Sequence, residues 1–538
     1  MTNTCLTLQG VCFTLADGRI LFHDLNEVFD QRRTALVGAN GAGKSVLARL
    51  LAGALAPSAG HCLRGGTVYY LAQQIAPAAT VAELAGVQPA LAALRRIEHG
   101  SADPADFDLL AERWDLRERL KAELDRCGLP HLQPDTAAAT LSGGEAMRVA
   151  LAGAWLSDAD FLILDEPSNH LDHANRTALL AQLRRWPNGL LVISHDRALL
   201  AQMERIVELS PLGLRSYGGD YAFYADCKRA ETDSAQRLLE QRKLERKRET
   251  QAMREQQERQ QRRQAHGASE GRDANQANIL LGGQKNRAQA SAGKLRQQHA
   301  VQQERLSRQV REAARHIVPT GAIAMHAMAG EQVARQRMAQ LDSVVLPYGV
   351  PDALSLTISG QQRIGVTGAN GSGKSTLLKL LAGQLAPRSG HCEVRARTAY
   401  LDQQLAQLEP QRSAVAHLLA VNREAGEAAL RTHLAQMGMD AQLAAAPVGT
   451  LSGGERLKVA LACALYAAPA AQLLLLDEPS NHLDLPTLQA LEAMLRQYRG
   501  AFLVVSHDEV FLQALQLSHR LQVGADGWTL EAVSEEWP

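Results

Sequence analysis

The chain has few aromatic residues, no paired cysteines and no long apolar run, and each absence excludes a class of protein. Its seven cysteines follow no CxxC spacing, which argues against a disulfide framework or a zinc or iron-sulfur site and fits a reducing cytoplasm. No apolar run approaches the roughly 20 residues that a membrane helix needs, and the N-terminus lacks the basic and apolar segments of an export signal. The sequence therefore predicts neither a membrane span nor secretion.

The chain also has no excess of either charge, because 57 Lys and Arg residues balance 57 Asp and Glu residues. Its 538 residues suggest about three or four domains, and an apolar content of 46% is ample for buried cores. The sequence thus predicts a globular protein of several domains.

What the chain does contain is a glycine-rich loop that occurs twice, at residues 38–45 and 368–375, 330 positions apart. Residues 33–37 form a short apolar pattern typical of a buried strand, and residues 46–51 continue as a predicted helix. Further segments recur at the same offset, as expected of a tandem duplication. We therefore predict two α/β domains of the P-loop type.

The loop residues suit the binding of ATP phosphates. The glycines let backbone amides turn toward the phosphates, and the helix N-terminus adds its dipole. Lys44 and Lys374 would neutralise the β- and γ-phosphates, while the hydroxyls of Ser45 and Ser375 would bind Mg2+. The other loop residues expected to bind ATP are Gly38, Asn40, Gly41, Gly43, Gly368, Asn370, Gly371, Gly373 and Thr376.

Each half also contains an apolar strand pattern that ends in two carboxylates. Asp165 and Asp477 are expected to hold Mg2+, and the following residues, Glu166 and Glu478, are expected to polarise the attacking water. A histidine closes another strand pattern 29 residues after each glutamate. A single histidine would more often be structural, but the matched spacing favours a catalytic role for His195 and His507.

Between these elements lies the sequence LSGGE, at residues 141–145 and 451–455. Here the chain resembles the ATP-binding cassette superfamily, in which this segment is the signature. The resemblance implies two cassettes packed head to tail, with each ATP between the phosphate loop of one and the signature of the other. ATP would close this pair and hydrolysis would open it. The implied signature contacts are Ser452, Gly453 and Gly454 for the ATP on Lys44, and Ser142, Gly143 and Gly144 for the ATP on Lys374.

The resemblance also implies further site residues. Gln73 and Gln403 match the Q-loop, which would contact Mg2+ and water, while residues 168–172 and 480–484 match the D-loop at the cassette interface. Tyr348 and Phe13 are the candidates for stacking on adenine, with a core aromatic as the alternative reading. Because both halves keep every expected chemical group, we expect both sites to hydrolyse ATP.

The segment between the cassettes is strongly basic. Residues 228–315 hold 21 Lys or Arg and 11 Asp or Glu, a net charge of +10, and no aromatic residue. A sparse apolar stripe predicts a two-helix hairpin, with a first helix of about 55 Å over residues 228–264. Glycines at positions 267, 271, 282, 283 and 293 are expected to mark its distal bend.

Two interpretations of this hairpin remain open: a solvated linker, or a probe for the backbone of structured RNA. The second interpretation is preferred because the tip, residues 259–296, has eight basic and two acidic residues. The candidate RNA contacts are Arg262, Arg263, Arg272, Lys285 and Arg287.

Two cassettes, no membrane domain and a helical linker together resemble the ABC-F family. Residues 217–224 also look like the segment that leads into the ABC-F linker. The resemblance implies a monomeric, cytoplasmic ATPase that binds the tRNA exit site of the ribosome, with its linker directed toward the peptidyl-tRNA. It would act in translation, in relief of stalling or in antibiotic resistance. The alternatives are a soluble ATPase subunit of a membrane transporter and a DNA-acting ATPase.

The expected domains are a first cassette at 1–225, a hairpin at 226–316 and a second cassette at 317–538. Gln73 lies 69 residues before Ser142, against 49 residues from Gln403 to Ser452, so the first cassette has an insertion of 20 residues. We expect this short arm within residues 90–130, in the charged stretch 106–126. A short arm weakens any claim of contact with the ribosomal L1 stalk.

Overall fold

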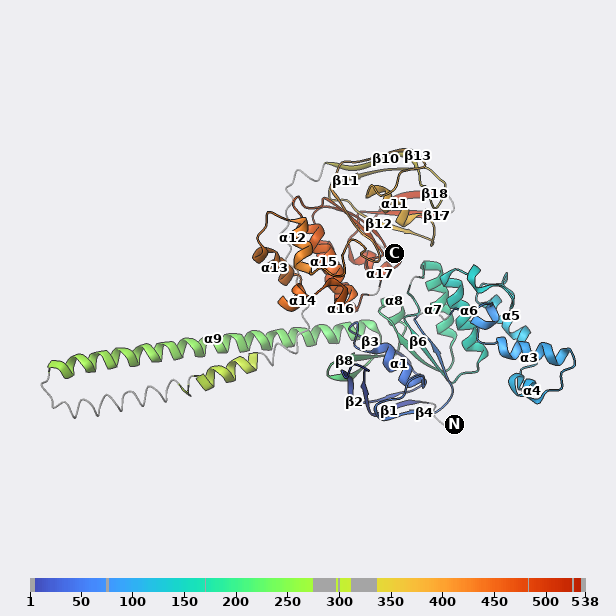
Figure 1. The fold of residues 1–538 in the computed structure, drawn as a ribbon, viewed down its shortest axis with the longest axis horizontal. Coiled ribbons are helices and arrows are strands. Elements are labelled where there is room, and N and C mark those ends of the chain that lie inside the picture. Colours follow the sequence, from blue (N-terminus) through green and yellow to red (C-terminus); the bar gives the residue numbers. More distant parts are fainter. Residues whose placement is uncertain are drawn as a thin grey trace. The chain divides into compact units, whose positions relative to one another are not determined.

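The computed structural model describes residues 5–73, 77–169, 171–273, 297–298, 300–310, 336–481, 483–524 and 527–533. The chain divides into two compact units, of which the first comprises Met1–Tyr224 and Gly321–Pro538 and the second Ala225–Thr320. The first unit contains both α/β domains, which we call the first cassette (residues 5–224) and the second cassette (residues 336–533) (Figure 1).

Each cassette is built on a six-stranded sheet with the same strand order, which confirms the predicted duplicated α/β fold. The order is β5-β6-β7-β3-β8-β9 in the first cassette and β14-β15-β16-β12-β17-β18 in the second. Five strands are parallel, and the last pairs antiparallel with its neighbour. The strands are β3 (Arg33–Gly38), β5 (Val68–Leu71), β6 (Phe161–Asp165), β7 (Gly189–Ile193), β8 (Arg205–Ser210), β9 (Gly213–Gly218), β12 (Arg363–Gly368), β14 (Thr398–Leu401), β15 (Leu473–Asp477), β16 (Ala501–Val505), β17 (His519–Gly524) and β18 (Gly527–Ala532).

The continuous apolar runs of the sequence become the central strands of these sheets. Every residue of β6, β7, β15 and β16 is buried, as expected of parallel strands that helices cover on both faces. Because the carboxyl ends of parallel strands lie at one edge, the carboxylates that close β6 and β15 reach the same edge as the glycine-rich loops after β3 and β12.

A three-stranded antiparallel sheet completes each cassette, in the order β2-β1-β4 or β11-β10-β13. Strand pairing aligns the two copies: Cys12 pairs with Ala59, and Val345 pairs with Ser389. The duplication offset is therefore 333 at β1 and 330 at β4, and it is already 330 at β3, which precedes the glycine-rich loop. These strands are β1 (Leu6–Thr14), β2 (Ile20–Phe29), β4 (Ala59–Arg64), β10 (Arg337–Val345), β11 (Leu354–Ser359) and β13 (Ser389–Val394).

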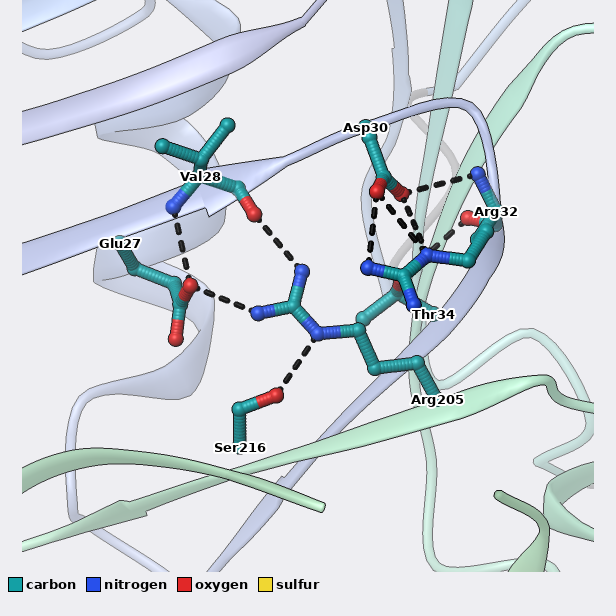
Figure 2. A network of polar contacts seen from close by, with 7 residues as sticks. All are labelled: Glu27, Val28, Asp30, Arg32, Thr34, Arg205 and Ser216. Atoms are coloured by element: carbon teal, nitrogen blue, oxygen red, sulfur yellow. Dashed lines mark hydrogen bonds and ion pairs between the residues drawn. The ribbon is translucent and has the colours of Figure 1, made fainter. Parts of the chain in front are cut away.

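Arg205 of β8 joins the two sheets of the first cassette (Figure 2). Its buried guanidinium donates to the Val28 carbonyl at 2.7 Å, to Glu27 Oε1 at 2.6 Å and to Ser216 Oγ at 2.7 Å. All three acceptors satisfy a charge that would otherwise be costly to bury. Arg205 therefore fixes β2 against β8 and β9.

The helices follow the capping signals of the sequence, such as the Ser142 and Ser452 capping boxes with Glu145 and Glu455. In the first cassette they are α1 (Lys44–Ala52), α2 (Val81–Leu84), α3 (Gln88–Glu98), α4 (Pro104–Leu110), α5 (Leu116–Arg126), α6 (Gly143–Leu156), α7 (His173–Arg185) and α8 (Arg197–Leu200). In the second they are α11 (Lys374–Leu381), α12 (Ala414–Val421), α13 (Glu427–Gln436), α14 (Ala441–Ala445), α15 (Gly453–Leu465), α16 (Leu485–Gln497) and α17 (Glu509–Ala514).

The insertion of the first cassette begins before the stretch 106–126 and overlaps only its first part, ahead of α5. Gly128 follows α5 and lies close to Arg148, and Gly438 follows α13 and lies close to Lys458, so the two helices are counterparts. The additional residues therefore form the end of α3, the whole of α4 and the turn that follows it. The prediction placed α5 in the insertion because most of its residues are charged. Its few apolar residues form a buried face that packs against α6.

The second unit contains a long helix, as predicted, but its bounds differ from the prediction. Helix α9 begins at Tyr221 and ends at Asp273, about 80 Å at 1.5 Å per residue. Gly267 and Gly271 lie inside α9, so they do not mark the bend. A single glycine costs a helix only about 1 kcal/mol, which the flanking helix formers offset. Residues 300–310 are helical as well.

Of the candidate RNA contacts, Arg262 is an exposed residue of α9, and Arg263 and Arg272 also lie on this helix. Lys285 and Arg287 lie outside the described residues. Among the helices that the structure describes, none combines the length and the apolar character that a bilayer-spanning segment requires.

Candidate nucleotide sites

Both glycine-rich loops link a central strand to a helix, and their last glycine must adopt a left-handed backbone. Gly43 and Gly373 are the N-caps of α1 and α11, with φ angles of 97° and 103°. A Cβ atom on Gly43 would lie 2.7 Å from the Phe22 ring, and one on Gly373 would lie 3.0 Å from the carbonyl oxygen of Tyr348. Glycine is therefore needed at both positions for the loop to turn.

The loop lysines lie folded over their own loops. Lys44 Nζ donates to the carbonyls of Gly38 at 2.9 Å and Ala39 at 3.1 Å. Lys374 Nζ makes the same two contacts in the second cassette, at 2.9 and 2.7 Å. Burial lowers the pKa of both lysines, while the nearby carboxylates oppose this shift. A phosphate at the loop would give each buried ammonium a full charge partner.

The first carboxylate at each strand end is held by a tyrosine. Tyr70 donates to Asp165 at 3.3 Å, and Tyr400 donates to Asp477 at 3.1 Å. Asp477 also accepts a hydrogen bond from Ser375 Oγ at 3.0 Å. Burial raises the pKa of both aspartates.

These groups suit a Mg2+ ion that is shared with phosphates. Asp165 Oδ1 is buried and has no hydrogen-bond partner among the described residues, so it is an acceptor in need of a cation. A serine hydroxyl and a carboxylate are hard oxygen ligands of the kind that Mg2+ prefers. Within the described residues no three His, Cys, Asp or Glu side chains gather into a metal site, so phosphate oxygens would have to complete the coordination.

The second carboxylates, Glu166 and Glu478, adopt a strained backbone. Their φ angles are 51° and 49°, in the left-handed region that non-glycine residues rarely occupy. In each case the amide donates to the neighbouring strand, to Ile193 at 2.8 Å or Val505 at 2.9 Å. Burial raises the pKa of Glu166 well above its usual range and that of Glu478 to about 8. The two copies therefore hold a carboxyl group of raised pKa in the same strained geometry.

A histidine lies next to each of these glutamates. His195 Nε2 lies 3.6 Å from Glu166 Oε1, and His507 Nε2 lies 3.4 Å from Glu478 Oε1. Burial lowers the pKa of His195 to about 3 and that of His507 to about 4, so both imidazoles are neutral near pH 7. His507 Nε2 is also 3.1 Å from Asn370 Oδ1 in the glycine-rich loop. Each histidine therefore lies beside its glutamate, and His507 also reaches the glycine-rich loop of its own cassette.

The D-loop aspartates connect the two cassettes. Asp484 Oδ1 caps α16 by accepting from the Thr487 amide at 3.1 Å, while Oδ2 accepts from the Asn40 amide of the first cassette at 3.1 Å. In the reciprocal contact, Asp172 Oδ2 accepts from the Asn370 amide at 3.4 Å. Each glycine-rich loop is therefore bound by a carboxylate of the other cassette.

The two glycines of each signature have different surroundings. A Cβ atom would meet nothing within 4 Å on Gly143 or Gly453. On Gly144 it would lie 2.4 Å from Asn175, and on Gly454 2.8 Å from Thr487. The first glycine therefore leaves room for a ligand at the N-terminus of α6 or α15, while the second allows close packing against α7 or α16.

A cavity of about 660 Å³ is lined by most of the residues predicted for the first site. Its walls include Asn40, Gly41, Gly43, Lys44, Ser45, Gln73, Asp165, Glu166 and His195 from the first cassette. The second cassette contributes Ser452 and Gly453, as the head-to-tail arrangement implies, whereas Gly454 packs away from the cavity. The structure thus brings the first loop and the second signature to one cavity.

The second cavity, of about 420 Å³, differs from the first. Its described lining comes entirely from the second cassette: Tyr348, Gly349, Asn370, Gly371, Gly373, Lys374, Ser375, Thr376, Gln403, Asp477, Glu478, Asn481, Val505 and His507. Ser142 and Gly144 are not among these residues, so the first signature does not line the second cavity.

Phe13, the candidate for stacking on adenine in the first site, does not line the first cavity. It packs on Phe22, with ring centroids 6.5 Å apart, and lies partly buried against the core of the first cassette. Leu15, Arg19 and Leu21 line the first cavity instead. With the offset of 333 that holds at β1, Leu15 is the counterpart of Tyr348. The offset of 330 between the glycine-rich loops does not align these two residues.

Two arginines at the cassette interface were not found from the sequence. Arg176 donates to the His507 carbonyl at 3.0 Å and pairs with Asp196 at 3.1 Å. Arg197 pairs with Glu492 at 2.8 Å. Both arginines lie in the first cassette, and the corresponding positions of the second cassette, 312 residues later, hold Leu488 and Glu509. A search based on the duplication therefore cannot detect them.

Comparison with known proteins places the sequence in a defined family. The family profile of the ABC transporter matches residues 25–169 and 351–481, which lie in the two cassettes. The tylosin resistance ATP-binding protein TlrC of Streptomyces fradiae is 31% identical over 96% of this chain and 96% of its own length. The ribosome protection protein VmlR of Bacillus subtilis is 28% identical over 94% of this chain and 85% of its own.

A relative whose name contains the subfamily is the ATP-binding cassette sub-family F member 3 of Rattus norvegicus, 31% identical over 90% of this chain and 66% of its own length. Among solved structures, the archaeal ribosome recycling factor aABCE1 in complex with ribosomal stalk protein aP1 has a TM-score of 0.57, with 20% identity over 95% of this chain and 87% of that one. This likeness concerns the fold alone.

Proposed function

Because this chain is a tandem ATP-binding cassette protein of the ABC-F type, we propose that it hydrolyses ATP at two sites and uses the cycle to bind and leave the ribosome. The proposed binding place is the tRNA exit site, where the protein would relieve stalling or protect the ribosome from antibiotics in the cytoplasm. The names of TlrC and VmlR support this proposal, because one confers tylosin resistance and the other protects ribosomes.

The observation that carries the ATPase proposal is the cavity shared by the first glycine-rich loop and the second signature. In this cavity Lys44 would release the Gly38 and Ala39 carbonyls and bind phosphate. The open N-terminus of α15 at Gly453 would bind the γ-phosphate from the other cassette. ATP would therefore hold the two cassettes together.

Glu166 and Glu478 are the proposed general bases, because they close central strands beside the loops. A carboxylate with a raised pKa accepts a proton from water more readily than an ordinary one. The neutral imidazole of His195 or His507 would donate a hydrogen bond to the γ-phosphate. Mg2+ held by Ser45 and Asp165, or by Ser375 and Asp477, would compensate the phosphate charge. The remaining proposed contacts are Gln73, Gln403, Ser142, Gly143 and Tyr348.

The ribosome proposal depends on the basic hairpin. Residues 228–315 have a net charge of +10, from 21 basic and 11 acidic residues, and Arg262 is exposed on α9. Arginine and lysine bind phosphate groups regardless of base sequence, which suits structured RNA.

The test is retention on ribosomes when hydrolysis is blocked. In the double variant Glu166→Gln, Glu478→Gln the cassettes should bind ATP and stay closed, so the tagged protein should co-sediment with ribosomes through a sucrose gradient only when ATP is present. The control is Glu118→Gln, Glu424→Gln, which changes one exposed glutamate in each cassette. Recovery of the double variant with membranes or with DNA would contradict the proposal and favour a transporter subunit or a DNA-acting ATPase.

A second experiment separates the hairpin from the cassettes. Replacement of Arg262, Arg263, Arg272, Lys285 and Arg287 by Ser should lower ribosome-stimulated ATP hydrolysis while basal hydrolysis stays unchanged. Unchanged stimulation would contradict a role of these residues in RNA contact, and loss of both activities would show that the segment is needed for folding.

A further inference from the structure

The beginning of α7 reaches the second nucleotide site with two side chains. Asp172 caps the helix and Arg176 follows four residues later, so the two lie on the same face. Asp172 Oδ2 accepts from the Asn370 amide at 3.4 Å, and Arg176 Nη1 donates to the His507 carbonyl at 3.0 Å. Asn370 Oδ1 and His507 Nε2 lie 3.1 Å apart. One helical turn of the first cassette therefore holds both partners of a contact inside the second site.

The guanidinium of Arg176 is held in place by its own cassette. Arg176 Nε lies 3.1 Å from Asp196 Oδ2, and the two side chains are 15% and 5% exposed. Asp196 is fixed in turn, because its Oδ1 caps α8 by accepting from the Ala198 amide at 3.0 Å. Burial, the charge of Lys374 and then that of Arg176 lower the pKa of His507 to about 4. Arg176 therefore restrains the backbone of His507 and favours its neutral imidazole.

The first site has only part of this arrangement. Asp484 accepts from the Asn40 amide at 3.1 Å, which repeats the aspartate contact. The position that corresponds to Arg176, 312 residues later, holds Leu488, which has no polar side-chain group to donate. Both ring nitrogens of His195 are buried and have no hydrogen-bond partner among the residues that the structure describes. The other cassette thus restrains the histidine of the second site through an arginine that the first site lacks.

We propose that Arg176 is a positioning residue of the second site, through which the first cassette holds His507 against the glycine-rich loop. The inference rests on the proposed hydrolysis of ATP at two sites and adds that the two sites differ in what they require from the opposite cassette. If His507 donates to the γ-phosphate, a shift of its backbone would weaken a contact that matters most in the transition state. Such a loss lowers the rate of hydrolysis and leaves ATP binding largely intact.

The test measures each site separately in the full-length protein. Glu166→Gln leaves only the second site able to hydrolyse ATP, and Glu478→Gln leaves only the first. In each background, rapid quenching follows the first turnover of bound ATP at increasing ATP concentration, which gives the maximal rate and the half-saturating concentration.

The variant is Arg176→Leu, which copies the residue at position 488. Its maximal rate should fall about tenfold in the Glu166→Gln background, because a hydrogen bond from a charged group is lost. Arg176 also lines the first cavity, so a smaller loss, below about threefold, is expected in the Glu478→Gln background. The half-saturating ATP concentration should change by less than about twofold in both backgrounds.

Two further variants separate positioning from folding. The matched control Arg184→Leu removes an exposed arginine of α7 that donates to Gln202 at 3.0 Å, and it should change neither rate. Arg176→Leu, Asp196→Asn also removes the buried charge that the single change leaves without its partner, while the remaining side-chain oxygen still caps α8. This double variant should lose the rate of the second site as the single variant does.

The outcomes distinguish failure of the inference from failure of the proposed function. Equal losses in both backgrounds, or a higher half-saturating concentration with an unchanged rate, would overturn the role of Arg176 and leave the two-site ATPase standing. A normal rate of the second site in the double variant would also overturn it. If both backgrounds with Arg176 intact hydrolyse no more ATP than Glu166→Gln, Glu478→Gln, the proposed ATPase function fails and the inference fails with it.

Discussion

Arg197 of α8 forms a buried ion pair with Glu492 of α16, with Nη1 and Oε1 2.8 Å apart, and this pair joins the two cassettes. The side chains are only 8% and 5% exposed. The duplication does not repeat the pair, because the corresponding positions, 312 residues away, hold Glu509 and Leu180. Glu509 pairs instead with Arg520 of its own cassette. The interface therefore has this ion pair on one side only.

This pair also lies close to the beginning of the long helix. Burial lowers the pKa of Arg197, but the charge of Glu492 and then that of Tyr221 raise it by more, so the net shift is upward. Tyr221 is the first residue of α9.

The ion pair should be energetically coupled. Arg197→Ala or Glu492→Ala alone leaves a buried charge without its partner, and each should destabilise the protein by about 3–5 kcal/mol. Arg197→Met, Glu492→Leu removes both charges and should cost much less, as measured by thermal and denaturant unfolding in a double-mutant cycle. Strictly additive losses would contradict a direct pair.

The aspartate contacts between cassettes should matter more for turnover than for folding. Asp484→Ser keeps a side-chain oxygen to cap α16 but is too short to reach the Asn40 amide, so stability should fall by less than about 1 kcal/mol. ATP hydrolysis should fall about tenfold, since a charged hydrogen bond contributes about 1.5–3 kcal/mol. The control Asp440→Ser changes a cap on α14 that makes no such contact. A similar loss of activity in both variants would mean that the caps alone are responsible.

The glutamate at the second site should destabilise the folded protein as pH rises. Burial raises the folded-state pKa of Glu478 from 4.5 to about 8, so between these values the unfolded chain ionises and is favoured. Without nucleotide, Glu478→Gln should therefore have the same Tm as the wild-type protein at pH 5 and a higher Tm at pH 8. The gain at pH 8 should correspond to about 1–3 kcal/mol in the free energy of unfolding. Glu424→Gln, an exposed control, should show no such trend. A constant Tm difference across this range would refute the buried, basic carboxylate.

The position that corresponds to Tyr348 should control adenine affinity at the first site. In a Lys374→Ala background, Leu15→Tyr should tighten binding of a fluorescent ATP analogue about threefold to tenfold, because aromatic stacking contributes about 0.5–1.5 kcal/mol. Phe13→Leu should leave the affinity unchanged and reduce only stability. If Phe13→Leu weakens nucleotide binding and Leu15→Tyr does not strengthen it, the alignment by strand register is wrong.

Much of the site could be predicted from the sequence because its chemistry depends on local patterns. The loop 38–45 needs its glycines, lysine and serine in one short turn, and the strand 161–165 ends in the carboxylates that face this turn. Such patterns survive a duplication, so residues 368–375 and 473–477 repeat them. The α/β fold follows from the same segments, because a buried strand before a phosphate loop and a helix after it recur in both halves.

The alignment of Leu15 with Tyr348 could not be predicted, because it depends on which residues pair across β1 and β4. The left-handed backbone of Glu166 and Glu478 was likewise hidden, since glutamate has no local preference for it. The pairing of Arg197 with Glu492 required two residues 295 positions apart to meet across an interface.

The sequence by itself therefore determined the duplicated fold and the chemical groups at both phosphate loops, because these are encoded within short contiguous segments. Only the tertiary structure decided that Asp484 binds Asn40, that Arg197 pairs with Glu492 and that the insertion exposes Phe107 and Trp114. These features arise from packing between distant segments, which sequence spacing does not specify.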